Sequence, residues 1–179
     1  PNTQNSMRNL AALYFYLERF ADSVGLLNQV LQLEMRAKGP EHPDTLLTMN
    51  NLAFIYGRQG RLDLAEATYV KTVEARVRVL GDIHPETMTS EQNLALVYHE
   101  QGKDALAEPV AREVLRARLK TEPEGWARYY AESILGTVLG GLKKTTDAET
   151  LLLSGYEGLK KTESTIPAGN RPNVQRSDR

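Results

Sequence analysis

The sequence repeats itself every 42 residues without a gap. Residues 51–56 read NLAFIY, residues 93–98 read NLALVY, and residues 9–14 read NLAALY. The linkers follow the same spacing, because residues 39–43 read GPEHP and residues 81–85 read GDIHP. A fixed period of this length is typical of stacked repeats, in which each unit buries its apolar face against its neighbours. The sequence therefore predicts an array that offers an extended surface rather than an enclosed pocket.

Each repeat is predicted to form two helices. Pro43 and Pro85 are each followed by an acidic residue. This pair favours the first turn of a helix, where the missing N–H does no harm and the negative charge meets the positive helix end. Apolar residues then recur on one helical face. Gly60 and Gly102 mark the turn to the second helix, and another glycine closes that helix.

These residues resemble the tetratricopeptide repeat. Its pattern of a large residue, a small residue, an aromatic three positions later, then another alanine and aromatic is matched by Leu52, Ala53, Tyr56, Ala65 and Tyr69. The usual unit has about 34 residues, and the longer unit here, with its Gly-x-x-His-Pro linker, resembles the kinesin light chain type. The resemblance implies an all-α fold, a right-handed α-solenoid of about four helix hairpins.

The resemblance divides the chain into four units, at about 1–39, 40–81, 82–122 and 123–163. The fourth unit is eroded, because it follows the third with an offset of 41 residues and carries a lysine in place of the turn glycine. From residue 164 onward the apolar period stops and prolines appear. Residues 164–179 are therefore expected to form an irregular tail.

The composition excludes several classes of protein. The chain has no cysteine and three histidines, so disulfides and thiolate metal sites are excluded, and no metal or cofactor is predicted. A net charge of −1 lacks the basic excess of nucleic-acid binders. No apolar run approaches the roughly 18 to 20 residues of a membrane span. We expect a cytoplasmic protein with a protein or peptide partner, without nucleic-acid binding or membrane insertion.

No catalytic motif is found in the sequence, so the chain is not expected to be an enzyme. His42 and His84 lack a neighbouring ligand and are interpreted as residues that fix the entry to a helix. The basic residues between 112 and 120, which include Arg118, are interpreted as a solvated outer face. Residues 148–160 resemble the closing repeats downstream of some bacterial serine/threonine protein kinases, whose catalytic motifs are absent here.

The resemblance also implies that the first helix of each unit lines a concave surface. The inward positions lie two residues before the leucine of each Leu-Ala pair and two, five and six residues after it, which forms one stripe of a helix. The candidate peptide contacts are Arg8, Ala12, Tyr16, Asn50, Phe54, Arg58, Gln92, Leu96 and His99. Amides suit a peptide backbone and aromatics suit apolar side chains. For Tyr16 and Phe54, a role in packing within the fold is an equal alternative to a peptide contact.

The sequence favours an interaction scaffold that binds a partner peptide in the concave groove. One alternative is self-association, since apolar residues crowd the first and last helices and the ends of a solenoid expose apolar surface. The array would then form a homo-oligomer through its ends. Another alternative is a regulatory or interaction region of a larger bacterial protein kinase.

Overall fold

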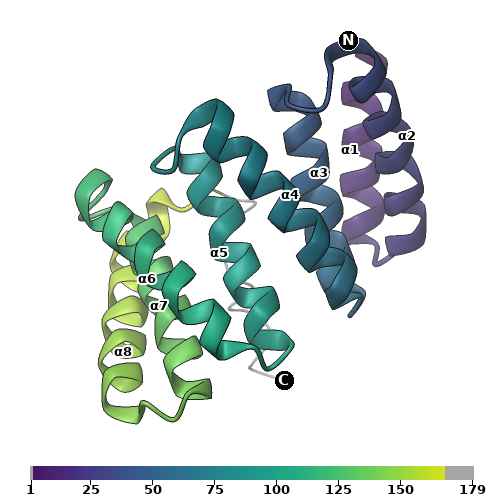
Figure 1. Cartoon of the computed structure of the whole chain (residues 1–179). Helices are drawn as coiled ribbons and strands as arrows, with labels where there is room; N and C mark the ends of the chain where they lie inside the picture. The colour runs from purple at the N-terminus through teal and green to yellow at the C-terminus, as the bar shows by residue number, and fades with distance from the viewer. Residues whose placement is uncertain (1, 168–179) are drawn as a thin grey trace. The chain divides into compact units, whose positions relative to one another are not determined.

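The computed structural model describes residues 2–167, which contain eight α-helices, one short 3-10 helix and no strand (Figure 1). The helices are α1 (Asn2–Tyr16), α2 (Phe20–Lys38), α3 (Pro43–Arg58), α4 (Leu62–Leu80), α5 (Pro85–Glu100), α6 (Asp104–Thr121), α7 (Trp126–Gly141), α8 (Thr145–Thr162) and the 3-10 helix η1 (Glu163–Thr165). The predicted all-α fold is confirmed. Most of the expected irregular tail, from residue 168 onward, lies outside the described residues.

The helices form two compact units, with α1–α5 in the first and α6–α8 in the second. In the first unit each helix packs on the next one along the chain, and in the second α6 packs on α7 and α7 on α8 (Figure 1). The boundary between the units falls at the turn after α5. Each unit is therefore a layer of antiparallel helices joined by short turns.

Histidine side chains begin two of the helices. The His42 Nδ1 atom accepts a hydrogen bond from the backbone N–H of Asp44 at 3.1 Å, and the His84 Nδ1 atom accepts one from Glu86 at 3.2 Å. In both helices proline follows as the first helical residue, where no N–H is needed. The helix-entry interpretation of these histidines is confirmed. At α7 the equivalent cap is Gly125, which has no side chain to accept a bond.

The turn inside each repeat requires a left-handed backbone. Gly60 and Gly102 both have φ of 72°, and the equivalent residues of the first and last repeats are Glu18 at 58° and Lys143 at 60°. Glycine adopts this conformation without a steric penalty, whereas a residue with a Cβ pays roughly 1–2 kcal/mol. The outer repeats therefore carry strain in their turns that the inner repeats avoid.

Replacing Lys143 with glycine is expected to stabilise the second unit by about 0.5–1 kcal/mol. The relief of left-handed strain outweighs the extra chain entropy that glycine loses on folding. Thermal unfolding followed by circular dichroism would measure this as a higher Tm. The control is Lys71→Gly, an exposed position inside α4, where glycine should cost about 1 kcal/mol. Equal losses in both variants would contradict the interpretation.

Two apolar clusters hold the first unit together. One joins α1, α2 and α3 through Ala11, Leu27, Leu52 and Ile55. The other joins α3, α4 and α5 through Ala53, Ala65, Tyr69, Leu94 and Val97. The alanine of each Leu-Ala pair is fully buried, because helices can approach closely only over a small residue. The repeat pattern therefore corresponds to the contacts between successive helices.

Candidate interaction surface

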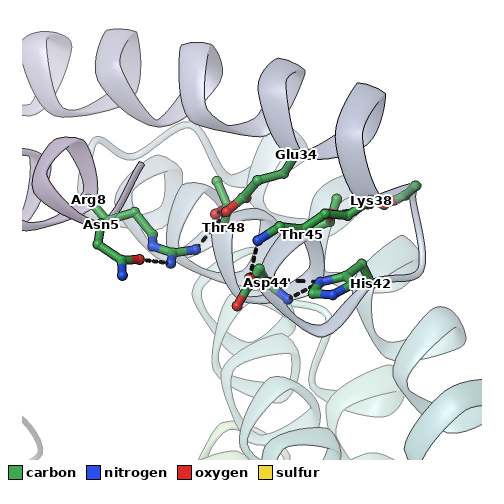
Figure 2. Close-up of polar contacts among 9 residues, drawn as sticks. Asn5, Arg8, Glu34, Lys38, His42, Asp44, Thr45 and Thr48 are labelled. Carbon is green, nitrogen blue, oxygen red and sulfur yellow. Dashed lines mark hydrogen bonds and ion pairs between the residues drawn. The ribbon is translucent and has the colours of Figure 1, made fainter. Parts of the chain in front are cut away.

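A buried ion pair joins the first three helices. The Arg8 Nη1 atom donates to Glu34 Oε1 at 2.7 Å, and Thr48 Oγ1 donates to Glu34 Oε2, also at 2.7 Å. Figure 2 shows Arg8 of α1 and Thr48 of α3 meeting at this carboxylate of α2, with Asn5 also bonded to Arg8. Glu34 is fully buried. A buried carboxylate needs such partners because its desolvation would otherwise be costly.

A second polar cluster lies between α3, α4 and α5. The Arg76 Nη1 atom donates to Ser90 Oγ and to the backbone oxygen of Glu86, both at 2.7 Å. Ser90 Oγ in turn donates to Asn50 Oδ1 at 2.7 Å. Burial lowers the pKa of Arg76, and the Glu86 carboxylate, 3.1 Å from Nη2, partly offsets this effect. The Arg76 guanidinium is therefore the centre of the second cluster, just as the Glu34 carboxylate is the centre of the first cluster.

The two clusters occupy the same positions of successive repeats with opposite charge. Asn50, Arg76 and Ser90 each lie 42 residues after a member of the first cluster. The next position in the series of buried charges is Arg118, which is also buried and pairs with Glu122 at 2.9 Å. Its expected place on a solvated outer face is therefore wrong. Three of the second helices, α2, α4 and α6, therefore turn this charged position inward.

These clusters revise the expected set of peptide contacts. Arg8 and Asn50 are bonded within the polar clusters, and Gln92, the equivalent residue of the third repeat, is buried. All three occupy the position two residues before the leucine of the Leu-Ala pair. Arg8 and Asn50 are held in the clusters because the buried charge on the second helix, Glu34 or Arg76, needs polar partners from the first helices. We therefore leave these three residues out of the proposed contact surface.

The exposed candidates gather around an aromatic patch on α1, α2 and α3, which consists of Phe15, Tyr16, Phe20 and Phe54. The Phe15 ring centroid lies 5.3 Å from that of Phe54, 5.7 Å from Tyr16 and 5.6 Å from Phe20. Tyr16 is 72% exposed and Phe54 is 43% exposed. Phe15 and Phe20 are half-buried. The patch therefore combines two supporting rings with two rings that face solvent.

The remaining candidates lie on α1, α3 and α5, which are the first helices of the hairpins in the first unit. Ala12 on α1 and Arg58 at the end of α3 are exposed, and Leu96 and His99 on α5 are half-buried. Leu96 is the repeat equivalent of Phe54.

A depression of about 440 Å³ lies away from the aromatic patch, at the α3–α4 turn beside Gln101. None of the residues of the aromatic patch lines this depression.

The described residues contain neither a metal-binding cluster nor a membrane-spanning helix. Within residues 2–167, no group of three histidine, aspartate or glutamate side chains is placed to hold a metal ion. Over the same range, every helix is too short or too polar to cross a lipid bilayer.

Comparison with protein families identifies these hairpins. The family model described as tetratricopeptide repeat matches residues 2–76 and 47–120. The chain belongs to the tetratricopeptide repeat family. Its first three units repeat every 42 residues and are joined by Gly-x-x-His-Pro linkers. A search of curated proteins finds no match.

Solved structures share the tetratricopeptide repeat fold. One is a variant of a Podosopora anserina protein with nearly identical kinesin light chain TPR-like repeats. It is 24% identical, covers 92% of this chain and 78% of that chain, and has a TM-score of 0.78. Another is BtubC from P. vanneervenii, 18% identical over 94% of this chain and 68% of that chain, with a TM-score of 0.79. At these identities the likeness establishes the fold alone.

Proposed function

We propose that this tetratricopeptide repeat chain is a protein-interaction scaffold that binds a peptide segment of a partner protein across α1 and α3. Tetratricopeptide repeats generally mediate protein–protein interactions, and this array offers a surface for such contacts. The observation that carries the proposal is the aromatic patch, where Tyr16 and Phe54 stay exposed on rigid helices. Large aromatic side chains of this kind commonly dominate binding energy.

The support for these two rings explains why they suit recognition. Phe15 touches both Tyr16 and Phe54 and is itself held by Phe20. A ring fixed by its neighbours loses little conformational freedom on binding, so more of the contact energy appears as affinity. Arg58, exposed at the end of α3, adds one positive charge on the same helix as Phe54. We therefore expect an apolar anchor on the peptide, with orientation set by charge.

Replacing Phe54 with alanine is expected to weaken peptide binding by roughly 10- to 30-fold, because loss of an aromatic hot spot costs about 1.4–2 kcal/mol. Random peptides displayed on phage would be selected against the chain. The selected peptides would then be titrated against the variant by fluorescence anisotropy. The expected selection enriches apolar or aromatic side chains.

The matched control is Leu33→Ala. Leu33 lies on α2 and is 44% exposed, close to the exposure of Phe54, so the variant loses a similar amount of apolar surface away from the patch. Its affinity should equal that of the unaltered chain. Equal affinities for Phe54→Ala and Leu33→Ala, or a selection that enriches no peptide, would overturn the proposal.

The alternative of a kinase region rests on the resemblance of residues 148–160 to repeats that follow bacterial kinase domains. That resemblance does not depend on the aromatic patch. It stays a hypothesis from the sequence and is compatible with peptide binding by the same chain.

A further inference from the structure

The outer face of α1 exposes positions that other repeats bury. Leu10 is 40% exposed, whereas Leu52, 42 residues later, is 2% exposed. Leu13 is likewise exposed, and its equivalent Ile55 is buried. At the first junction, where the second hairpin packs on the first, Leu52 and Ile55 pack in one cluster with Leu27 of α2. These positions are therefore built to receive the second helix of a preceding hairpin.

The outer face of α8 shows the opposite half of such a junction. Leu152 is 40% exposed, whereas its repeat equivalent Leu27 is 2% exposed beneath α3. Tyr156 is also exposed, and its equivalent Leu115 on α6 is buried. Second helices elsewhere in the chain use these positions to pack on the next first helix. The exposed residues of α8 therefore occupy the positions that pack on the next first helix elsewhere in the chain, and α1 is such a first helix.

Ion pairs mark the second and third junctions between successive hairpins at a fixed repeat position. Lys103 Nζ lies 2.7 Å from Glu66 Oε2, and Lys144 Nζ lies 2.7 Å from Glu108 Oε1. The hydrogen bond from each lysine is the main reason why the pKa of each glutamate falls below its usual value. In both cases a basic residue just before a second helix meets a glutamate on the preceding second helix. The pairing therefore occurs at two of the three junctions, whereas the first junction has Val24 at the glutamate position.

The two ends of the chain carry the unmatched halves of this pair. Arg19 precedes α2 at the position equivalent to Lys103, and Glu149 on α8 is equivalent to Glu108. Both are exposed. Among the contacts of the described residues, Arg19 stays within its own hairpin, through Asp22 of α2 at 2.7 Å and the Tyr14 ring of α1 at 4.3 Å. Within residues 2–167, Glu149 has no ion pair.

We infer that this chain associates head to tail with a second copy of itself, in the register of its internal repeats. The outer face of α8 of one copy packs on α1 of the next copy, with Leu152 against Leu10 and Leu13. Glu149 of the first copy pairs with Arg19 of the second.

The polar clusters fit this junction as well. The position of Glu34 and Arg76 is occupied on α8 by Leu159, and the position of Thr48 is occupied on α1 by Ser6. Docking the two ends therefore places no unpaired charge at this position, where one would oppose association. A head-to-tail contact leaves one free end on each side of every complex. The assembly consequently grows in length as the protein concentration rises.

Charge reversal tests the pairing. Sedimentation velocity of the full chain should show an average mass that rises between about 1 μM and 1 mM. Arg19→Glu and Glu149→Arg should each weaken association several-fold, on the order of 5- to 20-fold. The double variant should restore it, because each swapped end then meets the opposite charge on another copy. All positions are exposed, and circular dichroism would verify that each variant is folded.

A mixing experiment separates this contact from a symmetric dimer. Leu13→Glu blocks the head and Leu152→Glu blocks the tail, so each variant alone should stay monomeric. Their mixture should form a one-to-one dimer that grows no further. A monomeric unaltered chain at 1 mM, single reversals without effect, a double variant that stays as weak as the single ones, or a mixture that stays monomeric would overturn the inference.

Discussion

Replacing Glu34 with alanine is expected to destabilise the first unit by about 3–5 kcal/mol, the usual cost of removing one partner from a buried ion pair. The carboxylate is fully buried and receives hydrogen bonds from Arg8 and Thr48. Without it, the guanidinium and the hydroxyl keep their burial and lose their acceptor. A loss of this size is a large fraction of the 5–15 kcal/mol that typically holds a domain together.

The loss should be greatest at the N-terminal end of the array. Repeat proteins gain stability from contacts between neighbours, so a broken junction releases the hairpin beyond it. Hydrogen exchange measured by mass spectrometry should show faster exchange in α1 and α2 of the Glu34→Ala variant. Exchange in α4 and α5 should stay close to that of the unaltered chain.

Two controls separate the buried charge from a general effect of losing a glutamate. Glu74→Ala removes an exposed carboxylate from α4 and should change stability by less than about 0.5 kcal/mol. The triple variant Arg8→Met, Glu34→Met and Thr48→Val replaces the cluster with apolar side chains and should recover most of the loss. A Glu34→Ala variant as stable as Glu74→Ala would contradict the role of the cluster.

Replacing Gly158 with alanine is expected to destabilise the second unit by about 3 kcal/mol, at the upper end of the usual cost of overpacking. A Cβ atom at this position would overlap the ring of Tyr129 on α7. The ring is buried and its hydroxyl donates to Glu124 at 3.2 Å, so it has little freedom to move. Gly155, one turn earlier, also lies close to α7, since its Cβ would lie 2.8 Å from the Tyr129 carbonyl oxygen and nearer still to Ser133 Oγ.

The matched control for this substitution is Gly25→Ala. Gly25 lies inside α2, and a Cβ there would meet no atom within 4 Å. Alanine should therefore stabilise the first unit by about 0.5–1 kcal/mol through its higher helix propensity. Chemical denaturation would measure both variants. Replacing glycine with alanine should therefore raise the stability at position 25 and lower it at position 158. A Gly158→Ala variant of unchanged stability would mean that α7 and α8 are not so closely packed.

Much of the fold could be predicted from the sequence, because the features that start and end helices are local. The two His-Pro pairs mark the starts of α3 and α5, and the turn glycines mark the left-handed residues between paired helices. The loss of glycine at Lys143 was also visible, although the strain that it implies required the backbone angle. The close approach of α7 and α8 was not predicted, since it depends on which residue faces Gly158.

The peptide contacts stay a prediction, but the structure separates the candidate residues by their burial. The helical stripe includes Tyr16 and Phe54, which are exposed in the structure. It also includes Arg8, Asn50 and Gln92, which the structure places in polar clusters or in the interior. A signal for these clusters was present in the sequence. Charged residues recur at 42-residue spacing on the second helices, at 34, 76 and 118. Periodicity shows that these positions are equivalent, whereas their burial depends on the neighbouring helices.

Site-specific crosslinking tests peptide binding by the aromatic patch most directly. A benzophenone amino acid would replace Phe54 in one sample and Leu33 in another, and each would be irradiated with a peptide selected against the unaltered chain. Mass spectrometry should find the peptide attached at position 54 and not at position 33. Attachment at position 33 alone, or equally at both positions, would contradict binding at the patch.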